Sequence, residues 1–216
     1  MALNTLALAA TPGATAPELL VLLAGAYDKP ADFLAAGFDT ALRASGRALD
    51  LILVESDLSA VCDGSLSARI ENEILVGARQ SGYRRILTGG ISIGGLAALM
   101  HADRYPGGGD GLVLIAPYPG NRSITGEIDR AGGLANWPAN GDFATNDERC
   151  GWRALQRCAQ HRTPPVWLGY GAEDRFAGGH AMMAAVLDPD RCCVVDGGHD
   201  WPTWRRLWQR YLPGHG

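Results

Sequence analysis

The sequence predicts an α/β fold in which a mostly parallel, twisted sheet of about seven strands lies between two layers of helices. Short apolar runs recur along the chain and alternate with segments of helical periodicity. The runs are apolar at consecutive positions, which is typical of strands covered on both faces. The chain has 216 residues, 47% of them apolar, which suffices for one core of ordinary domain size. We therefore expect a single domain, residues 1–216, built as a three-layer α/β/α sandwich with right-handed crossovers.

The strands and helices follow one another in a regular order. The first predicted strand, residues 5–10, is short, and the second, residues 19–24, is a run of aliphatic residues that ends at Gly25. Further strands of this kind are predicted at residues 49–54, 85–88, 112–116, 165–169 and 192–196. Helical patterns are found at residues 31–45, 66–81, 92–104, 152–160, 179–187 and 202–212.

Residues 118–150 break this alternation. The segment is rich in Gly, Asn, Asp and Pro, and its helical pattern is limited to one short stretch near residues 126–134. A long irregular connection in a compact domain often carries binding residues. We expect an excursion over one edge of the fold that forms at most a minimal lid.

Charge and composition exclude several classes of function. Nineteen Lys and Arg residues against 23 Asp and Glu residues give a net charge of −4, and without a basic run a nucleic-acid partner is not expected. Lys29 is the one lysine and stands between Asp28 and Pro30, so a phosphate-binding Gly-Lys-Ser/Thr loop is absent. No run of about 18 apolar residues predicts a membrane span. Residues 1–15 carry no basic side chain and include Pro12-Gly13, which favours a short strand and a turn over a signal peptide.

The cysteine and histidine residues give no metal or disulfide pattern. Five cysteines are present, an odd number, and neither Cys-x-x-Cys nor His-x-x-x-His occurs. A disulfide framework and a thiolate zinc site are therefore not expected. This usage fits a reducing compartment, and we expect a cytoplasmic location.

The most informative segment is the one from Arg85 to His101. It contains Gly90-Ile91-Ser92-Ile93-Gly94 between an apolar strand and a helix rich in Ala and Leu, which is the setting of a nucleophile elbow. Small residues are needed on both sides of the serine because the strand and the helix approach closely there. The turn places the hydroxyl at a helix N-terminus, where the Ile93 N–H can face a developing oxyanion. Ser92 is therefore the candidate nucleophile, whereas the glycine spacing does not fit a dinucleotide-binding loop.

A serine nucleophile needs a base, and the base needs an acid that orients it. Both are expected at the carboxyl ends of later strands. Asp174 lies in the loop after the predicted strand 165–169, and His199 follows the last predicted strand through two glycines. We therefore expect Ser92, Asp174 and His199 to form a catalytic triad.

Other residues compete for these roles. Glu173 follows the same strand as Asp174, but adjacent side chains point in different directions, and we expect Glu173 to stay solvated or to pair with an arginine. His180 is the alternative base, although it lies at the start of a helical stretch. His101 is expected to point away from the site at the far end of the elbow helix. Asp200 is also explained as the N-cap of the last helix.

Three segments resemble the α/β-hydrolases, and in particular serine esterases of the esterase D and enterochelin-esterase type. They are Gly90-Ile91-Ser92-Ile93-Gly94-Gly95, Gly171-Ala172-Glu173-Asp174, and Gly197-Gly198-His199-Asp200-Trp201 followed by Trp204. The resemblance spans residues 19–212 and implies an α/β-hydrolase fold with Ser92 as nucleophile, Asp174 as acid and His199 as base. It departs from the family in its short or missing N-terminal antiparallel strands and in the absence of a His-Gly pair before the oxyanion loop.

The second oxyanion donor is expected in the loop after residues 19–24, where a hydrolase sheet presents such a group. We expect the backbone N–H of Ala26, with that of Tyr27 as the alternative, and an ordinary strand-to-helix turn is the competing interpretation. Because the pattern lacks a His-Gly pair, the choice between the two donors stays open.

The expected reaction is hydrolysis of a carboxylic ester or thioester through an acyl-enzyme, with no metal and no organic cofactor. Acyl transfer to an alcohol or amine through the same intermediate is one alternative, and a non-catalytic binding protein on a hydrolase scaffold is another. The expected partner is a small-molecule ester or thioester, bound by Tyr27, Asp57, Tyr118 and the segment 118–150. The acyl group, the leaving group and the oligomeric state are left open.

Overall fold

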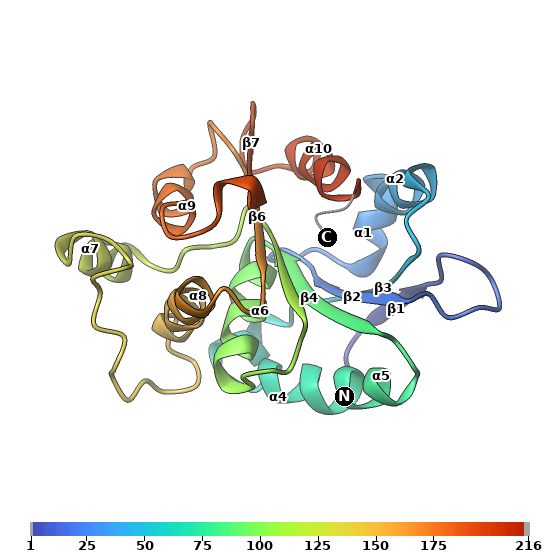
Figure 1. Cartoon of the computed structure of the whole chain (residues 1–216), viewed down its shortest axis with the longest axis horizontal. Coiled ribbons are helices and arrows are strands. Elements are labelled where there is room, and N and C mark those ends of the chain that lie inside the picture. Colours follow the sequence, from blue (N-terminus) through green and yellow to red (C-terminus); the bar gives the residue numbers. More distant parts are fainter. Residues whose placement is uncertain (1, 214–216) are drawn as a thin grey trace.

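The computed structural model describes residues 2–213, and within them one twisted sheet runs through the molecule (Figure 1). Its strand order is β1-β3-β2-β4-β5-β6-β7. The strands are β1 (Thr5–Leu8), β2 (Glu18–Leu23), β3 (Leu49–Val54), β4 (Arg85–Ile91), β5 (Gly111–Ile115), β6 (Val166–Gly171) and β7 (Cys192–Val195). β1 pairs antiparallel with β3, and all the other neighbours are parallel. The predicted mostly parallel sheet is confirmed.

Helices cover both faces of this sheet (Figure 1). One layer contains α1 (Pro30–Ala35), α2 (Phe38–Ser45) and α10 (Trp201–Tyr211). The other contains α4 (Leu66–Ile70), α5 (Val76–Gln80), α6 (Ile93–Arg104) and α8 (Arg149–His161), with α7 (Arg122–Arg130) and α9 (Ala177–Ala184) packed at its outer side. Shorter elements are α3 (Leu58–Cys62), the π-helical turn η1 (Glu71–Leu75) and the 3-10 turn η2 (Pro189–Arg191).

β2 shows why the strands are apolar at consecutive positions. Leu20 and Leu22 pack in the core under α1, α2 and α10, whereas Leu19, Val21 and Leu23 pack in the core under α6 and α8. Successive side chains of a strand point to opposite faces. A strand with a helical layer on each side therefore needs apolar residues at every position.

Several element boundaries differ from the prediction. The helix expected at residues 31–45 is divided into α1 and α2 because Gly37 adopts a left-handed conformation (φ 80°). β4 continues to Ile91, beyond the predicted end at residue 88, because the absence of a side chain at Gly89 lets the strand lie against Val113 of β5. α3 was not predicted because it has no distinct hydrophobic period, and the helix expected at residues 66–81 is present as α4, the π-helical turn η1 and α5.

α7 begins at Arg122, earlier than the predicted helix near residues 126–134. The Asn121 side chain accepts hydrogen bonds from the N–H groups of Ser123 and Ile124 and so caps the helix there. Gly132 and Gly133 follow its end with positive φ angles, which a helix cannot continue through. A polar cap and a glycine pair thus set both ends of α7.

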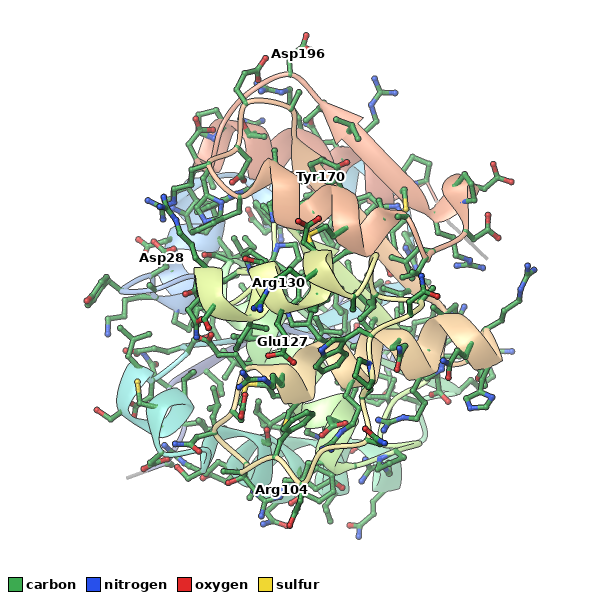
Figure 2. The ribbon with its side chains drawn as sticks, turned by 90° about the vertical axis from the view of Figure 1, so that its left-hand side faces the viewer. Asp28, Arg104, Glu127, Arg130, Tyr170 and Asp196 are labelled. Atoms are coloured by element: carbon green, nitrogen blue, oxygen red, sulfur yellow. The ribbon has the colours of Figure 1, made fainter. Side chains whose placement is uncertain are left out.

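The segment 118–150 is fastened to α8. In Figure 2, Glu127 and Arg130 mark α7, which lies at the front between α9 above and α8 below. The Gln156 amide of α8 donates to the carbonyl oxygens of Leu134 and Trp137 at 2.7 and 2.8 Å. Arg149 bonds Glu127 at 2.8 Å. The excursion is therefore a packed part of the fold.

The elbow is the place where backbones approach most closely. A Cβ atom on Gly90 would lie 2.2 Å from the carbonyl carbon of Gly94, and one on Gly94 would lie 2.4 Å from the carbonyl oxygen of Leu23. Both distances are well inside van der Waals contact. β4, β2 and α6 can meet here only because these positions carry no side chain.

Within residues 2–213, no helix has the length and apolar character needed to cross a bilayer.

Replacing Gly94 by alanine should push α6 away from the end of β2. We expect Gly94→Ala to lower the free energy of unfolding by at least about 2 kcal/mol, measured by urea denaturation. The matched control is Gly126→Ala in α7, where a Cβ atom would meet nothing within 4 Å and stability should stay the same or rise by up to about 1 kcal/mol. Equal effects of the two substitutions would contradict the close-packed elbow.

Candidate active site

Ser92, His199 and Asp174 meet at the carboxyl ends of the strands. Ser92 stands between β4 and α6, Asp174 follows β6, and His199 lies between β7 and α10. His199 Nε2 is 2.8 Å from Ser92 Oγ, and His199 Nδ1 is 2.7 Å from Asp174 Oδ2. With Asp174 accepting a hydrogen bond from Nδ1–H, Nε2 is unprotonated and is left to accept the serine hydroxyl proton. The geometry is that of a nucleophile, a base and an orienting acid.

The backbone of Ser92 is held in an unusual conformation. Its φ and ψ angles are 52° and −120°, a combination rare for a residue with a side chain. The Ser92 N–H donates to the carbonyl oxygen of Ile115 at 3.1 Å, and the Ser92 carbonyl accepts from the Tyr118 N–H at 2.8 Å. Both peptide groups of Ser92 are thus bonded to the end of β5 and the turn after it.

Asp174 is a buried carboxylate with two kinds of donor. Its side chain is 0% exposed, and Oδ1 accepts the Phe176 N–H at 2.8 Å while Oδ2 faces His199. Burial by itself raises the pKa of Asp174, but the hydrogen bonds from His199 and Phe176 outweigh it, so the pKa lies below its usual value. The charged form therefore contributes stability at neutral pH, and that contribution is lost as the pH falls through the lowered pKa.

Aromatic rings fix the plane of the His199 ring. Phe176 and Trp204 both lie edge-to-face with it at 5.1 Å between centroids. The adjacent Asp200 accepts the Thr203 N–H at 2.9 Å and caps α10. The Gly-His-Asp-Trp-x-x-Trp motif thus combines the candidate base, a helix cap and an aromatic contact.

The competing candidates occupy other positions. Glu173 is exposed, in line with the first of the two expected alternatives, and its carboxylate accepts the Gly197 N–H. His180 bonds the Pro117 carbonyl oxygen at 2.8 Å, and His101 bonds Glu71 at 3.0 Å at the far end of α6. His199 therefore occupies the position next to Ser92 that a base requires.

The loop after β2 borders Ser92. A Cβ atom on Gly25 would lie 3.7 Å from Ser92 Cβ, so the backbone of this loop passes beside the serine. Tyr27 has a positive φ of 67° and is 86% exposed. On the other side of Ser92, Ile93 is the first residue of α6, and its N–H has no intrahelical acceptor. Ile93 and either Ala26 or Tyr27 stay the predicted oxyanion donors.

Asp28 is a carboxylate near the site that the sequence did not single out. Burial raises its pKa, and a hydrogen bond from Trp201 and the attraction of His199 offset only part of that rise. Its carboxylate lies over Gly25, where a Cβ atom would be 2.5 Å from Oδ2. Its place after β2, at the same edge of the sheet as the triad, is the signal that would have identified it.

The three predicted substrate-binding residues differ in their surroundings. Tyr118 contacts Ser92 through its backbone, and its ring lies edge-to-face with Phe176 at 5.3 Å. Asp57 caps α3 by accepting the Ser59 N–H at 3.0 Å and lies 3.6 Å from Arg69. Tyr27 projects into solvent. Tyr118 is thus the one that these contacts place beside the triad.

A groove of about 840 Å³ begins at Tyr118 and Phe176 and runs between α7 and α9. Its polar lining includes Asn121, Arg122, Asp129 and Arg175. Because Phe176 also contacts the His199 ring, the groove adjoins the triad.

All five cysteines are free thiols. Among residues 2–213, no group of three or more His, Cys, Asp or Glu side chains is placed to hold a metal ion.

No protein-family model matches the chain, and no curated protein matches it in sequence. Solved structures are similar to it in fold. The S-formylglutathione hydrolase FrmB from Staphylococcus aureus aligns with a TM-score of 0.65 at 15% identity, over 90% of this chain and 82% of that one. Est1E from Butyrivibrio proteoclasticus aligns at 0.65 and 14% identity, over 98% and 91%. The fluorophosphonate-binding serine hydrolase FphF of Staphylococcus aureus aligns at 0.63 and 13% identity, over 98% of both chains.

At these identities the likeness establishes the architecture. The chain has an α/β-hydrolase fold, as the resemblance in its motifs predicts.

Proposed function

We propose that the protein is a serine hydrolase that cleaves a carboxylic ester or thioester through an acyl-enzyme. The observation that carries the proposal is the continuous chain of hydrogen bonds from Asp174 through His199 to Ser92. It is supported by the fold, which is shared with proteins described as an S-formylglutathione hydrolase and a ferulic acid esterase.

Acylation begins when Ser92 Oγ adds to the substrate carbonyl carbon and His199 Nε2 takes its proton. The carbonyl oxygen becomes an oxyanion facing the Ile93 N–H and that of Ala26 or Tyr27. Collapse breaks the bond to the alcohol or thiol, which leaves with the proton from His199. Water then adds to the acyl-enzyme by the same steps and releases the acid and Ser92.

Asp174 acts on His199 throughout. Its carboxylate accepts a hydrogen bond from Nδ1–H, keeps Nε2 directed at Ser92 and stabilises the imidazolium that forms in each step. Phe176 and Trp204 keep the ring from rotating out of this position. No metal or organic cofactor takes part in these steps.

Substrate binding is assigned to Tyr118 and the groove beyond it. The Tyr118 and Phe176 rings form an apolar start to the groove next to the triad, suited to an acyl chain or an alcohol. Tyr27 lies on the opposite side of Ser92, on the loop after β2, and Asp57 contributes through the loop after β3.

Removing the nucleophile tests the proposed function directly. Ser92→Ala should lower kcat for p-nitrophenyl esters by about 10⁴-fold or more and abolish labelling by a fluorophosphonate, while the melting curve shows a folded protein. Undiminished ester turnover in this variant would reject the serine mechanism.

The two adjacent carboxylates should differ sharply. Asp174→Asn preserves shape but favours the wrong imidazole tautomer, so kcat should fall by about 10³- to 10⁴-fold. Glu173→Gln should cost less than about tenfold because its carboxylate contacts the exposed Gly197 N–H and not His199. Steady-state kinetics on both variants, with melting curves, make the comparison. If kcat falls strongly in Glu173→Gln and stays near wild type in Asp174→Asn, the acid is misassigned by one residue.

Tyr118, at the start of the groove, should influence the turnover of esters with longer acyl chains most. We expect Tyr118→Ala to lower kcat/KM for p-nitrophenyl esters of medium chain length by about tenfold relative to acetate, since a partly buried aromatic contact of about 1.5 kcal/mol is lost. Tyr105→Ala is the control, because Tyr105 packs on His101 far from the triad. A chain-length profile that is the same in both variants would place the acyl group elsewhere.

A further inference from the structure

His180 is a buried histidine that the proposed reaction does not use. It lies in α9 with 0% exposure, and its Nε2 is 2.8 Å from the Pro117 carbonyl oxygen. A carbonyl oxygen only accepts, so Nε2 carries the proton. Nδ1 is buried without a hydrogen-bond partner, and burial lowers the pKa of the ring. The ring is therefore neutral, with Nδ1 unprotonated.

The Pro117 carbonyl belongs to the turn that holds the nucleophile. Ala116 has a positive φ of 44°, and the Tyr118 N–H donates to the Ser92 carbonyl at 2.8 Å. A small rotation of the peptide after Pro117 would move this donor away from Ser92. From the side of α8, the Trp152 indole N–H bonds the Pro119 carbonyl at 2.8 Å.

On its own side of this contact, His180 is connected to the loop that carries Asp174. The Ala177 N–H donates to the Asp174 carbonyl at 2.8 Å, the Phe176 N–H donates to the Asp174 carboxylate at 2.8 Å, and the His180 N–H donates to the Phe176 carbonyl at 3.0 Å. His180 therefore lies in the first turn of α9, directly after the loop that carries Asp174, and its ring reaches the turn that holds Ser92.

The two loops are packed tightly where this contact forms. A Cβ atom on Gly179 would lie 2.6 Å from Pro119 Cβ, and one on Gly95 would lie 2.8 Å from Pro117 Cβ. The turn is thus clamped between α6 and α9. An apolar side chain at position 180 would fill the same space without an unpartnered buried nitrogen, which carries a desolvation cost. The Nε2–H donor is what distinguishes histidine from such a residue.

We infer that His180 is a positioning residue which fixes Ser92 relative to Asp174 by tying the acid loop to the turn after β5. This inference rests on the proposed function. Displacing one end of a triad by a fraction of an ångström weakens the reaction without removing any reacting group. Protonation of Nδ1 would place a cation beside Asp174, in competition with His199, so the neutral ring is the form that serves this role.

The test compares His180→Leu, which removes the donor, with His180→Gln, whose amide can reach the Pro117 oxygen. The enzyme is titrated with a fluorophosphonate, and kcat and KM for p-nitrophenyl acetate are expressed per titrated site. We expect kcat per site to fall about tenfold in His180→Leu with KM within about threefold, and the Gln variant to regain kcat to within about threefold of wild type. The control is His101→Leu, which replaces another buried histidine, on α6. It should lower the melting temperature and leave kcat per site unchanged.

An unchanged kcat per site in His180→Leu, or equal losses in the Leu and Gln variants, would overturn the inference and leave His180 a packing residue. If His180→Leu does not fold, His180→Asn, whose amide is too short to reach Pro117, replaces it with the same expectation. A wild-type protein that neither labels nor turns over esters would instead reject the proposed function.

Discussion

The close approach of α6 to the ends of β2 and β4 is the constraint on which the rest of the site depends. Because Gly90 and Gly94 leave no space for side chains, the chain must reverse within one residue, and Ser92 takes the strained conformation that this reversal requires. The hydroxyl then stands above the strand ends, where the loops after β2, β6 and β7 converge. A wider gap at the elbow would relax Ser92 and separate it from His199.

The aromatic residues on the opposite face of the sheet determine the position of His199. Phe38 stacks on Trp208 of α10 at 5.3 Å, and the Trp208 indole donates to the Phe38 carbonyl at 3.0 Å. α10 is thereby fixed against α2, and Trp204 on the same helix contacts the His199 ring. Core packing far from the reacting atoms thus determines where the imidazole lies.

The sequence predicted the features that depend on local chemistry and strand order. Strands buried on both faces have a distinct apolar pattern, and the side chains after β4, β6 and β7 had to meet because parallel strands end at one edge. Features that depend on tertiary contacts were missed. Asp28 approaches His199 only through the fold, Glu173 finds Gly197 across two loops, and the start of α7 depends on one capping asparagine. The roles assigned to Ser92, Asp174 and His199 stay predictions until the variants are measured.

The two helices that line the groove, α7 and α9, are attached to different parts of the fold. α9 is joined to the loop that carries Asp174, whereas α7 is held to α8 by the buried Ile124 and Ile128 and by polar contacts, with Glu148 accepting from Asn121 and Arg149 bonding Glu127. If the groove receives part of the substrate, the contacts between α7 and α8 set the width of the groove, and these contacts do not include the reacting atoms. Substitutions at the α7–α8 contacts should then change which substrates the groove accepts, while bond cleavage in the smallest ester continues unaltered.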